Sequence, residues 1–374
     1  MKNDYQSLPK YPCEKDVWDI LAAERRPIVV YGMGNGADKL LSRFEKYGIT
    51  VSDFFASDGF VRGHSFHGKR VKSFSEIKEE YSEFVVVLSF ASGREEVLSL
   101  FRALDAEHTL YIPDMPVAGE QYFDRAFYNE NYASIESAYA ALSDELSRAV
   151  FASVLHYKLS GKLAPLMAFT QKREETLSLL PKDMRVMLDG GAYHGDTAKE
   201  ALSVFSSLSK VFAVEPDKKI FKKLSRLAES EPRIVPIFGA LYKEKGEATF
   251  FGSSNRNSSL VSASFEHRED TVPLQTVDDI LADVCVDYIK YDVEGSEREA
   301  LEGSLSVIQR DHPALLVSMY HRSEDIFSLI LYLRDHLPEG YRLYLRRLGV
   351  VPAWDLDLLA IPEKGNEKSC SCNL

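Results

Sequence analysis

The sequence predicts an α/β protein made of two doubly wound parallel sheets. Short apolar runs alternate with helical patterns along most of its 374 residues, which is typical of parallel sheets. In each half a glycine-rich turn follows the first strand, at 32–37 and at 189–195. A chain of this length can bury two separate cores. We therefore expect a front domain over residues 1–118, a helical linker over 119–180, a second domain over 181–363 and a disordered tail over 364–374.

The front domain begins with a helical pattern over residues 16–26, which Pro27 ends. A buried strand follows at Ile28–Tyr31, and the turn Gly32-Met-Gly-Asn-Gly-Ala37 leads into the next helix. Later elements are expected as strands at Val51–Ala56, Val85–Ser89 and Thr109–Ile112 and a helix over Arg94–Leu104. In the linker, apolar spacing predicts two or three helices, with breaks at Gly161 and Pro165.

The second domain repeats the alternation of strand and helix and ends in an antiparallel hairpin. Its expected strands are Val186–Leu188, Val211–Val214, Ile234–Phe238, Cys285–Tyr291 and Leu315–Met319. Its main helices are expected over Thr197–Leu208, Asp217–Ser230, Ser296–Gln309 and Ser323–Leu337. The closing hairpin is expected to pair Tyr341–Arg346 with Leu356–Ile361 at the edge of the sheet.

Two motifs of the second domain indicate a nucleotide-like ligand. The turn after its first strand holds Asp189, Gly190, Gly191, Ala192 and Gly195, and Asp196 and Thr197 begin the next helix. Such a turn allows close approach of a ligand to backbone amides at a helix N-terminus. Twenty residues after Gly195, the second strand ends in Glu215-Pro216. An acid at that place usually binds a ribose diol in nucleotide-binding α/β folds.

A third motif makes the prediction of a nucleotide-like ligand more specific. It is the run Asp287-Tyr-Ile-Lys-Tyr-Asp-Val-Glu-Gly-Ser-Glu297. Together the three motifs resemble the FkbM family of S-adenosylmethionine-dependent methyltransferases, over about residues 181–363. One departure is the glycine pair Gly190-Gly191, where many members carry a bulkier residue. The resemblance implies a class I methyltransferase fold with S-adenosyl-L-methionine as cofactor. It also implies an O-methyltransferase that acts on a sugar or glycan hydroxyl in cell-surface polysaccharide or natural-product biosynthesis.

The resemblance assigns parts of the cofactor to particular residues. Glu215 would accept hydrogen bonds from the ribose diol, and the loop from Asp189 to Ala192 would meet the amino-acid moiety. Gly239-Ala240, at the end of the third strand, is placed for the adenine. The front domain in turn resembles the small Rossmann-like domain that precedes some sugar-modifying enzymes, where the glycine loop lies near a sugar nucleotide. A tight turn without a ligand is an equally good interpretation of Gly32–Ala37.

Methyl transfer to a hydroxyl also requires a group that takes the proton. Lys290, Asp292 and Glu294 alternate along a strand end, so the three side chains are expected to share one face. His321 ends the neighbouring strand. An imidazole, with a reference pKa near 6.5, suits this task better than a carboxylate near 4. We therefore expect His321 to remove the proton and Asp292 and Glu294 to position the reactants, unless His321 only packs and the carboxylates take its role.

Composition limits the partners. A net charge of −12 argues against a nucleic-acid groove. Asp292 and Glu294 could hold a divalent metal of the kind that some sugar methyltransferases need, but two carboxylates are an incomplete site, so no residue is assigned as a metal ligand. The polar start of the chain and the lack of a bilayer-length apolar run predict a cytoplasmic protein without a membrane span. The expected partner is a small-molecule or glycan acceptor, and a homo-oligomer is compatible with the sequence. A non-catalytic sugar-nucleotide binding module and a nicotinamide-dependent oxidoreductase are the alternative functions.

Overall fold

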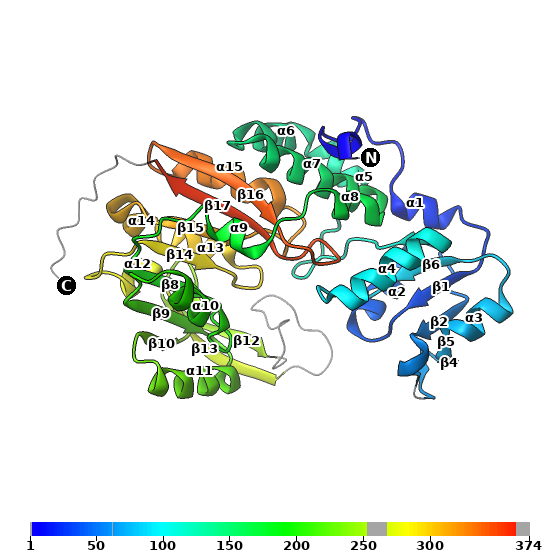
Figure 1. Ribbon diagram of the computed structural model, residues 1–374, viewed down its shortest axis with the longest axis horizontal. Coiled ribbons are helices and arrows are strands. Elements are labelled where there is room, and N and C mark those ends of the chain that lie inside the picture. The colour runs from blue at the N-terminus through cyan, green and yellow to red at the C-terminus, as the bar shows by residue number, and fades with distance from the viewer. Residues whose placement is uncertain (1, 62, 253–267, 364–374) are drawn as a thin grey trace.

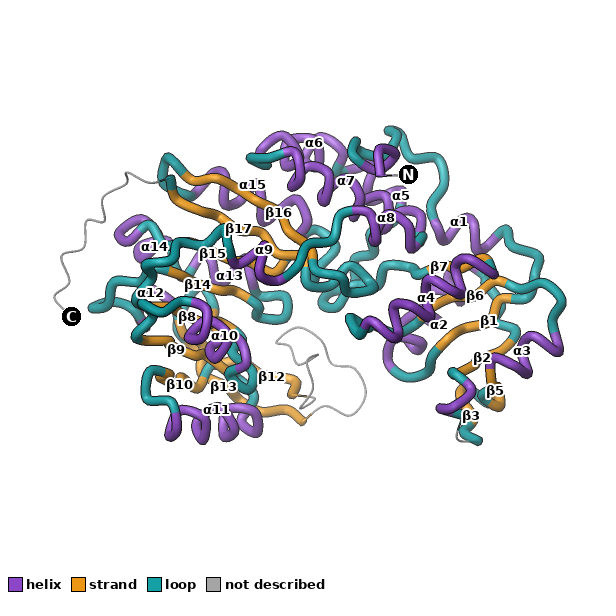
Figure 2. Tube along the Cα trace, viewed as in Figure 1, coloured by secondary structure: helices purple, strands orange, loops and turns teal. Residues whose placement is uncertain are grey.

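Two parallel sheets lie at opposite ends of an elongated molecule, with a helical segment between them (Figure 1). The computed structural model describes residues 2–61, 63–252 and 268–363, so the tail expected at 364–374 lies outside the described residues. The strands of each sheet form one compact group (Figure 2). The fold class expected from the sequence, two doubly wound α/β units, is confirmed.

The front sheet has five parallel strands in the order β5-β2-β1-β6-β7. In this order β1 lies in the middle, with β2 and then β5 on one side and β6 and then β7 on the other. The chain thus changes the side on which it adds strands next to β1, as in Rossmann-type halves. The strands are β1 (Ile28–Tyr31), β2 (Asp53–Ala56), β5 (Lys72–Ser73), β6 (Val85–Leu88) and β7 (Thr109–Tyr111), with the short pair β3 (Ser65–Phe66) and β4 (Lys69–Arg70) beside them. The helices are α1 (Val17–Ala22), α2 (Asn35–Tyr47), α3 (Phe74–Glu80) and α4 (Glu95–Glu107), with two 3-10 turns at Lys2–Tyr5 and Asp58–Phe60.

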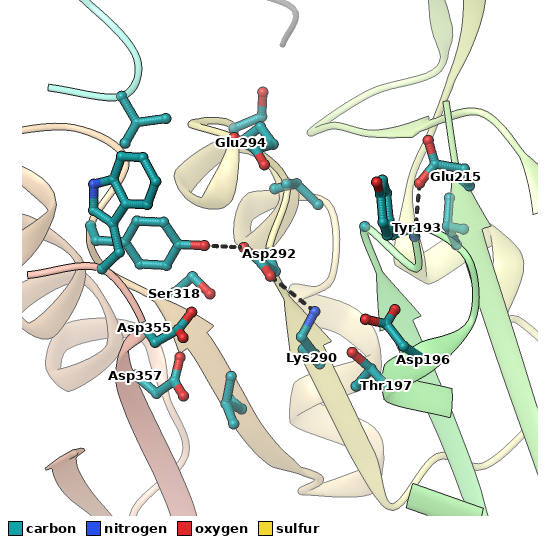
Figure 3. Close-up of a pocket in the computed structure, with 18 of the residues that line it drawn as sticks. Tyr193, Asp196, Thr197, Glu215, Lys290, Asp292, Glu294, Ser318, Asp355 and Asp357 are labelled. Atoms are coloured by element: carbon teal, nitrogen blue, oxygen red, sulfur yellow. Dashed lines mark hydrogen bonds and ion pairs between the residues drawn. The ribbon is translucent and has the colours of Figure 1, made fainter. Parts of the chain in front are cut away.

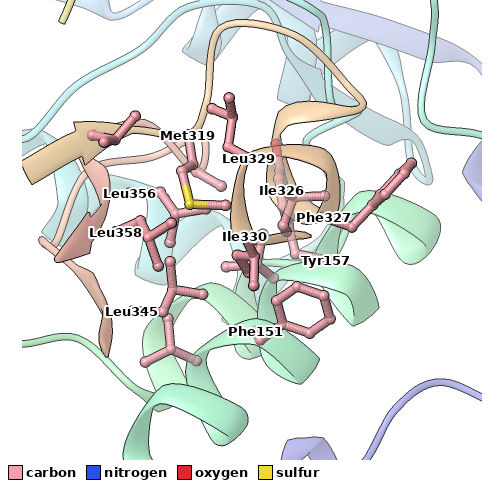
Figure 4. Close-up of a cluster of buried hydrophobic side chains, with 14 of the residues drawn as sticks. Phe151, Tyr157, Met319, Ile326, Phe327, Leu329, Ile330, Leu345, Leu356 and Leu358 are labelled. Carbon is pink, nitrogen blue, oxygen red and sulfur yellow. The ribbon is translucent and has the colours of Figure 1, made fainter. Parts of the chain in front are cut away.

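The segment between the sheets contains five helices, more than the two or three expected. They are α5 (Arg125–Glu130), α6 (Tyr132–Ala141), α7 (Glu145–Ser160), α8 (Leu163–Ala168) and α9 (Arg173–Leu177). Gly161 ends α7 in a left-handed conformation (φ 63°), as expected for a helix C-cap. Phe151 and Tyr157 of α7 pack with side chains of the second domain, including Ile330 and Leu345 (Figure 4). The segment is therefore part of the second domain's core and more than a connection.

The second sheet has seven strands in the order β10-β9-β8-β14-β15-β17-β16. The first five are parallel, and β17 is antiparallel to both of its neighbours. The strands are β8 (Val186–Gly190), β9 (Lys210–Glu215), β10 (Ile234–Phe238), β14 (Tyr288–Tyr291), β15 (Ala314–Ser318), β16 (Tyr341–Arg347) and β17 (Leu356–Pro362). The helices are α10 (Asp196–Val204), α11 (Lys218–Ser230), α12 (Val277–Ile280), α13 (Glu297–Glu302), α14 (Leu305–Asp311) and α15 (Asp325–His336).

Alternate side chains of this sheet enter two different cores. Met187 and Val211 pack with α10 and α11, whereas Leu188 and Phe212 pack with the cluster that contains α15 and α7. The central strands β8 and β9 are thus apolar on both faces, which explains why the sequence shows continuous rather than alternating apolar runs there.

Two elements differ from the expectation. The helix predicted over 296–309 is divided into α13 and α14 at Gly303 and Ser304, because the backbone of Ser304 (φ −129°, ψ 5°) leaves the helical region. A small sheet, β11 (Ala240–Leu241), β13 (Arg268–Gln275) and β12 (Gly246–Gly252), also lies between β10 and α12, in addition to the strands set out above. In the described ranges no helix is long and apolar enough to cross a bilayer.

Candidate active site

A cavity of about 800 Å³ opens at the carboxyl ends of the second sheet. It lies where the strand order reverses, between β8 and β14, which is the usual ligand position in open α/β sheets. Figure 3 shows its residues in two groups, with Tyr193, Thr197 and Glu215 on one side and Ser318, Asp355 and Asp357 on the other. Lys290 and Asp292 stand between them. A cavity of this volume suits a cofactor with part of a second ligand.

The glycine loop forms the wall beside β8. The backbone amides of Gly191 and Ala192 donate to the carbonyl of Val214, at 3.1 and 2.9 Å, which fixes the loop against β9. Gly191 has a left-handed backbone (φ +77°), and a Cβ there would overlap the carbonyl oxygen of Asp292. Only glycine allows this close approach between the loop and the end of β14.

Glu215 lies at the end of β9 and is only 5% exposed, yet it lines the cavity. Its Oε2 accepts a hydrogen bond from the amide of Tyr193 (2.9 Å), and its Oε1 accepts one from the amide of Asp217 (2.8 Å). Burial raises the pKa of Glu215 to about 8, although the two amides oppose that change. Each carboxylate oxygen has a second lone pair for a ligand donor. The geometry therefore suits a pair of adjacent hydroxyls.

Lys290 lies between two acids, Asp189 on β8 and Asp292 just after β14. Its Nζ lies 3.2 Å from Oδ2 of Asp292 and 3.5 Å from Oδ1 of Asp189. Burial alone would raise the pKa of Asp292, but Lys290 and then His321 lower it to about 2. Asp189 is fully buried, and burial raises its pKa despite the neighbouring cation. Asp292 thus carries a negative charge into the cavity at neutral pH, and Asp189 lies beneath it.

Glu294 and His321 form the second cluster of charges. Glu294 lines the cavity and has a left-handed backbone (φ 55°), which is uncommon for a residue with a side chain. His321 is fully buried: its Nδ1 lies 2.9 Å from Oε1 of Glu297, and its Nε2 lies 3.5 Å from Oε2 of Glu294 and 3.6 Å from Oδ1 of Asp292. Burial alone would lower the pKa of His321, but Glu297 and Glu294 raise it to about 10.

Two parts of the second domain build the other side of the cavity. Strand β15 contributes Ser318 and the following Tyr320, whose hydroxyl donates to Oδ1 of Asp292 (3.1 Å). The hairpin after β16 contributes Trp354, with its ring 6.5 Å from that of Tyr320, as well as Asp355 and Asp357. Burial raises the pKa of Asp357 to about 7. This side combines aromatic surface with carboxylates that accept hydrogen bonds.

The front domain closes this side of the cavity. The loop after β6, residues 91–94, lines it together with Val117. Ser92 and Val351 exchange two backbone hydrogen bonds, of 2.8 and 3.0 Å, which join the front loop to the hairpin. The front domain therefore shapes the site of the second domain.

The front glycine turn has a different environment. A Cβ at Gly32 would meet the ring of Phe90, and one at Gly36 would overlap the carbonyl oxygen of Ser89. These two glycines are explained by packing of the turn against the end of β6, which favours the interpretation of a tight turn. A sugar-nucleotide site there stays a prediction.

The structure brings most of the sequence-predicted residues to one cavity. Those that line it are Gly191, Asp196, Thr197, Glu215, Pro216, Gly239, Ala240, Lys290, Asp292 and Glu294. Asp189, Gly190, Ala192, Gly195 and His321 lie behind the wall instead. Among the described residues, no cluster of three or more potential ligands is arranged to hold a metal ion.

Sequence analysis missed the second side of the cavity. Tyr320 adjoins the predicted His321, so its position at a strand end was available as a signal. Trp354, Asp355 and Asp357 stand at the start of the last strand, where an aromatic with two acids was the only local signal. No local pattern identifies Ser92 or Arg94, because their place depends on how the front domain packs.

The comparisons with known proteins agree with this geometry. Residues 189–349 match the family model of the methyltransferase FkbM domain. Among solved structures, the chain is similar to the methyltransferase FkbM from Methylobacillus flagellatus KT, at 20% identity and a TM-score of 0.69, over 96% of this chain and 95% of that one. This likeness extends over both domains and shows the fold. A comparison with curated proteins finds no match.

Two further solved structures resemble about half of the chain more weakly. The precorrin-6y C5,15-methyltransferase from Geobacter metallireducens GS-15 has 13% identity and a TM-score of 0.32, over 51% of this chain and 90% of that one. Fibrillarin from Aeropyrum pernix, solved with natively bound S-adenosyl-L-methionine, has 15% identity and a TM-score of 0.31, over 49% and 67%.

The second sheet and its cavity define a methyltransferase of class I fold. The chain carries a methyltransferase domain of the FkbM family, with the family's match over residues 189–349. The resemblance to FkbM methyltransferases that the three sequence motifs indicated is confirmed.

Proposed function

We propose that this methyltransferase takes its methyl group from S-adenosylmethionine and transfers it to a hydroxyl group of a sugar or glycan. The single observation that carries the choice of methyl donor is the buried carboxylate of Glu215. Its two oxygens accept hydrogen bonds from the amides of Tyr193 and Asp217, and each oxygen has a second lone pair that can accept from a ligand in the cavity. A ribose diol offers two adjacent hydroxyl donors that suit this arrangement.

The remaining residues on this side fit other parts of the same donor. The uncapped N-terminus of α10, with Gly195 at its N-cap and Thr197 in the cavity wall, provides amides for a carboxylate. Gly239 and Ala240 follow β10 and line the cavity, at a place that suits the adenine. When bound, the donor supplies an electrophilic methyl group. Asp292, which stays negative at neutral pH, favours a positively charged group beside it.

Transfer to an oxygen requires that the acceptor be held in line and that its proton leave. The wall formed by Tyr320, Trp354, Asp355 and Asp357 suits a hydroxyl-rich ring, which can stack on an aromatic side chain and donate to carboxylates. The sugar or glycan class is supported by this wall and by the family resemblance. Incubating the full chain with tritiated methyl donor and a panel of neutral sugars, nucleotide sugars and oligosaccharides tests it.

The Glu215→Ala variant tests the choice of donor. Above pH 8, where Glu215 is ionised, losing its charge-assisted hydrogen bonds to the diol should weaken binding of S-adenosylmethionine by about 2–4 kcal/mol, measured by calorimetry. Glu231→Gln is the control, because this acid lies at the exposed end of α11 and pairs with Arg233. An affinity unchanged in a folded Glu215→Ala protein would remove this residue from the donor site.

A further inference from the structure

The proton acceptor of the reaction can be assigned from the contacts behind the cavity wall. His321 was expected to take the proton. Its ring is 0% exposed and does not line the cavity, so an acceptor hydroxyl has no route to either ring nitrogen. Glu294, by contrast, keeps about a quarter of its side chain exposed and faces the cavity.

Both nitrogens of His321 lie within 3.6 Å of carboxylate oxygens, as close charge contacts rather than aligned hydrogen bonds. Nδ1 lies 2.9 Å from Glu297, which is itself 1% exposed, while Nε2 lies between Glu294 and Asp292 at 3.5 and 3.6 Å. A neutral imidazole carries one N–H and would turn a lone pair toward one of these oxygens. Only the doubly protonated ring presents a proton on each side. The carboxylates on both sides of the ring therefore favour the doubly protonated imidazolium form of His321.

Among the described residues that face His321, no cation competes with its ring. Asp325, at the start of α15, accepts from the backbone amide of Arg322 and adds a further acid. The guanidinium of Arg322 is directed to the carbonyl oxygen of Gly295 (2.7 Å). Lys290 lies on the far side of Asp292. His321 is consequently the central positive charge of an acidic cluster.

Glu297 explains why this cation matters for the shape of the site. Its Oε1 accepts from the amide of Val293 (2.8 Å) and its Oε2 from the amide of Gly295 (3.1 Å), so it holds the backbone on both sides of Glu294. A Cβ at Gly295 would also overlap with Ala118, which limits the movement of this turn. His321 and Glu297 together keep Glu294 in its left-handed conformation, a strained geometry that the surrounding contacts must enforce.

We infer that Glu294 takes the proton of the acceptor hydroxyl, and that His321 is a permanently protonated positioning residue that holds Glu294 and Asp292 in place. This inference rests on the proposed function. As the acceptor oxygen bonds to the methyl carbon, the bond between that carbon and sulfur breaks and its electron pair stays on sulfur. The hydroxyl proton passes to the Glu294 carboxylate and leaves later to solvent. Burial raises the pKa of Glu294 to about 8, so its ionised form, which gains population as the pH rises toward 8, is a stronger base than an ordinary carboxylate.

Ring nitrogen-15 NMR of the full chain, labelled in its nine histidines, tests the protonation of His321 without any acceptor. One ring should stay doubly protonated up to pH 8.5, and that signal should vanish in His321→Gln. The signal of exposed His67, which faces the single carboxylate of Asp38 (2.7 Å), should vanish in the control variant His67→Gln and leave the protonated ring in place. If every ring loses its proton below pH 7.5, the inference is wrong whether or not the variant folds.

Carboxyl carbon-13 NMR of glutamate-labelled protein tests Glu294, with Glu294→Gln to assign its signal. Its midpoint should lie near pH 8 and should rise in His321→Gln, because a neighbouring cation is lost; a role in packing alone would leave it unchanged. A midpoint near 4.5 would overturn the assignment of Glu294 as the base. Calorimetry with S-adenosylmethionine separates a failure of the proposed donor site from a failure of the assigned proton acceptor. If Glu294→Gln binds it within about threefold of the parent chain, the donor site is intact and any failure concerns the proton acceptor alone.

Discussion

The Gly191→Ala substitution probes how the donor loop is built. Two costs can be read from the structure. A residue with a side chain at φ +77° costs about 1–2 kcal/mol. The added methyl group would in addition overlap the carbonyl oxygen of Asp292, and such overpacking costs typically about 1–3 kcal/mol. The free energy of unfolding should therefore fall by about 2–5 kcal/mol.

Gly119→Ala is the matched control for this variant. Gly119 has the same φ of +77°, but no atom lies within 4 Å of the position that a Cβ would take there. It should lose only about 1–2 kcal/mol, the cost of the backbone conformation. Chemical unfolding measures both variants, and calorimetry should show donor affinity at least tenfold weaker for Gly191→Ala alone. Equal losses in the two variants, with normal donor binding, would refute the claim that the loop and the end of β14 are in contact.

Two further predictions concern charge. Glu294 and His321 have folded-state pKa values of about 8 and 10, raised above their ordinary 4.5 and 6.5, so the folded chain holds more protons than the unfolded chain. The stability they contribute is complete at low pH and is lost as the pH rises through 8 and 10, by up to about 1.4 kcal/mol per pH unit for each group. Thermal unfolding between pH 5 and 9.5 should show this fall, and a flat profile would contradict it. Arg347 is fully buried and donates to three backbone carbonyls, two of them in the hairpin loop of the cavity, so Arg347→Met should destabilise the chain by about 2–4 kcal/mol. Exposed Arg342→Met on the same strand should cost under about 0.5 kcal/mol, and similar melting temperatures for the two would refute the role of Arg347.

Local patterns predicted the parts of the site that follow directly from one strand end. The glycine loop, Glu215 and Asp292 each stand at the end of an apolar run, and the parallel sheet brings those ends together. Trp354 and Ser92 were not predicted, because their place depends on the hairpin and the front loop meeting across more than 250 residues. The protonation of His321 was equally hidden, since it depends on Glu297 and on carboxylates from a neighbouring strand. The break after Gly303 depends on the backbone conformation of Ser304, which helical periodicity does not reveal.

Calorimetry of the unmodified full chain with S-adenosylmethionine tests the central claim most directly. Matched titrations with S-adenosylhomocysteine, NAD and a UDP-sugar complete the measurement and separate the methyltransferase from the two alternative functions. We predict saturable one-to-one binding of S-adenosylmethionine and of S-adenosylhomocysteine, and no binding of NAD at comparable concentrations. Binding of NAD in place of S-adenosylmethionine, or of the UDP-sugar alone, would contradict the account.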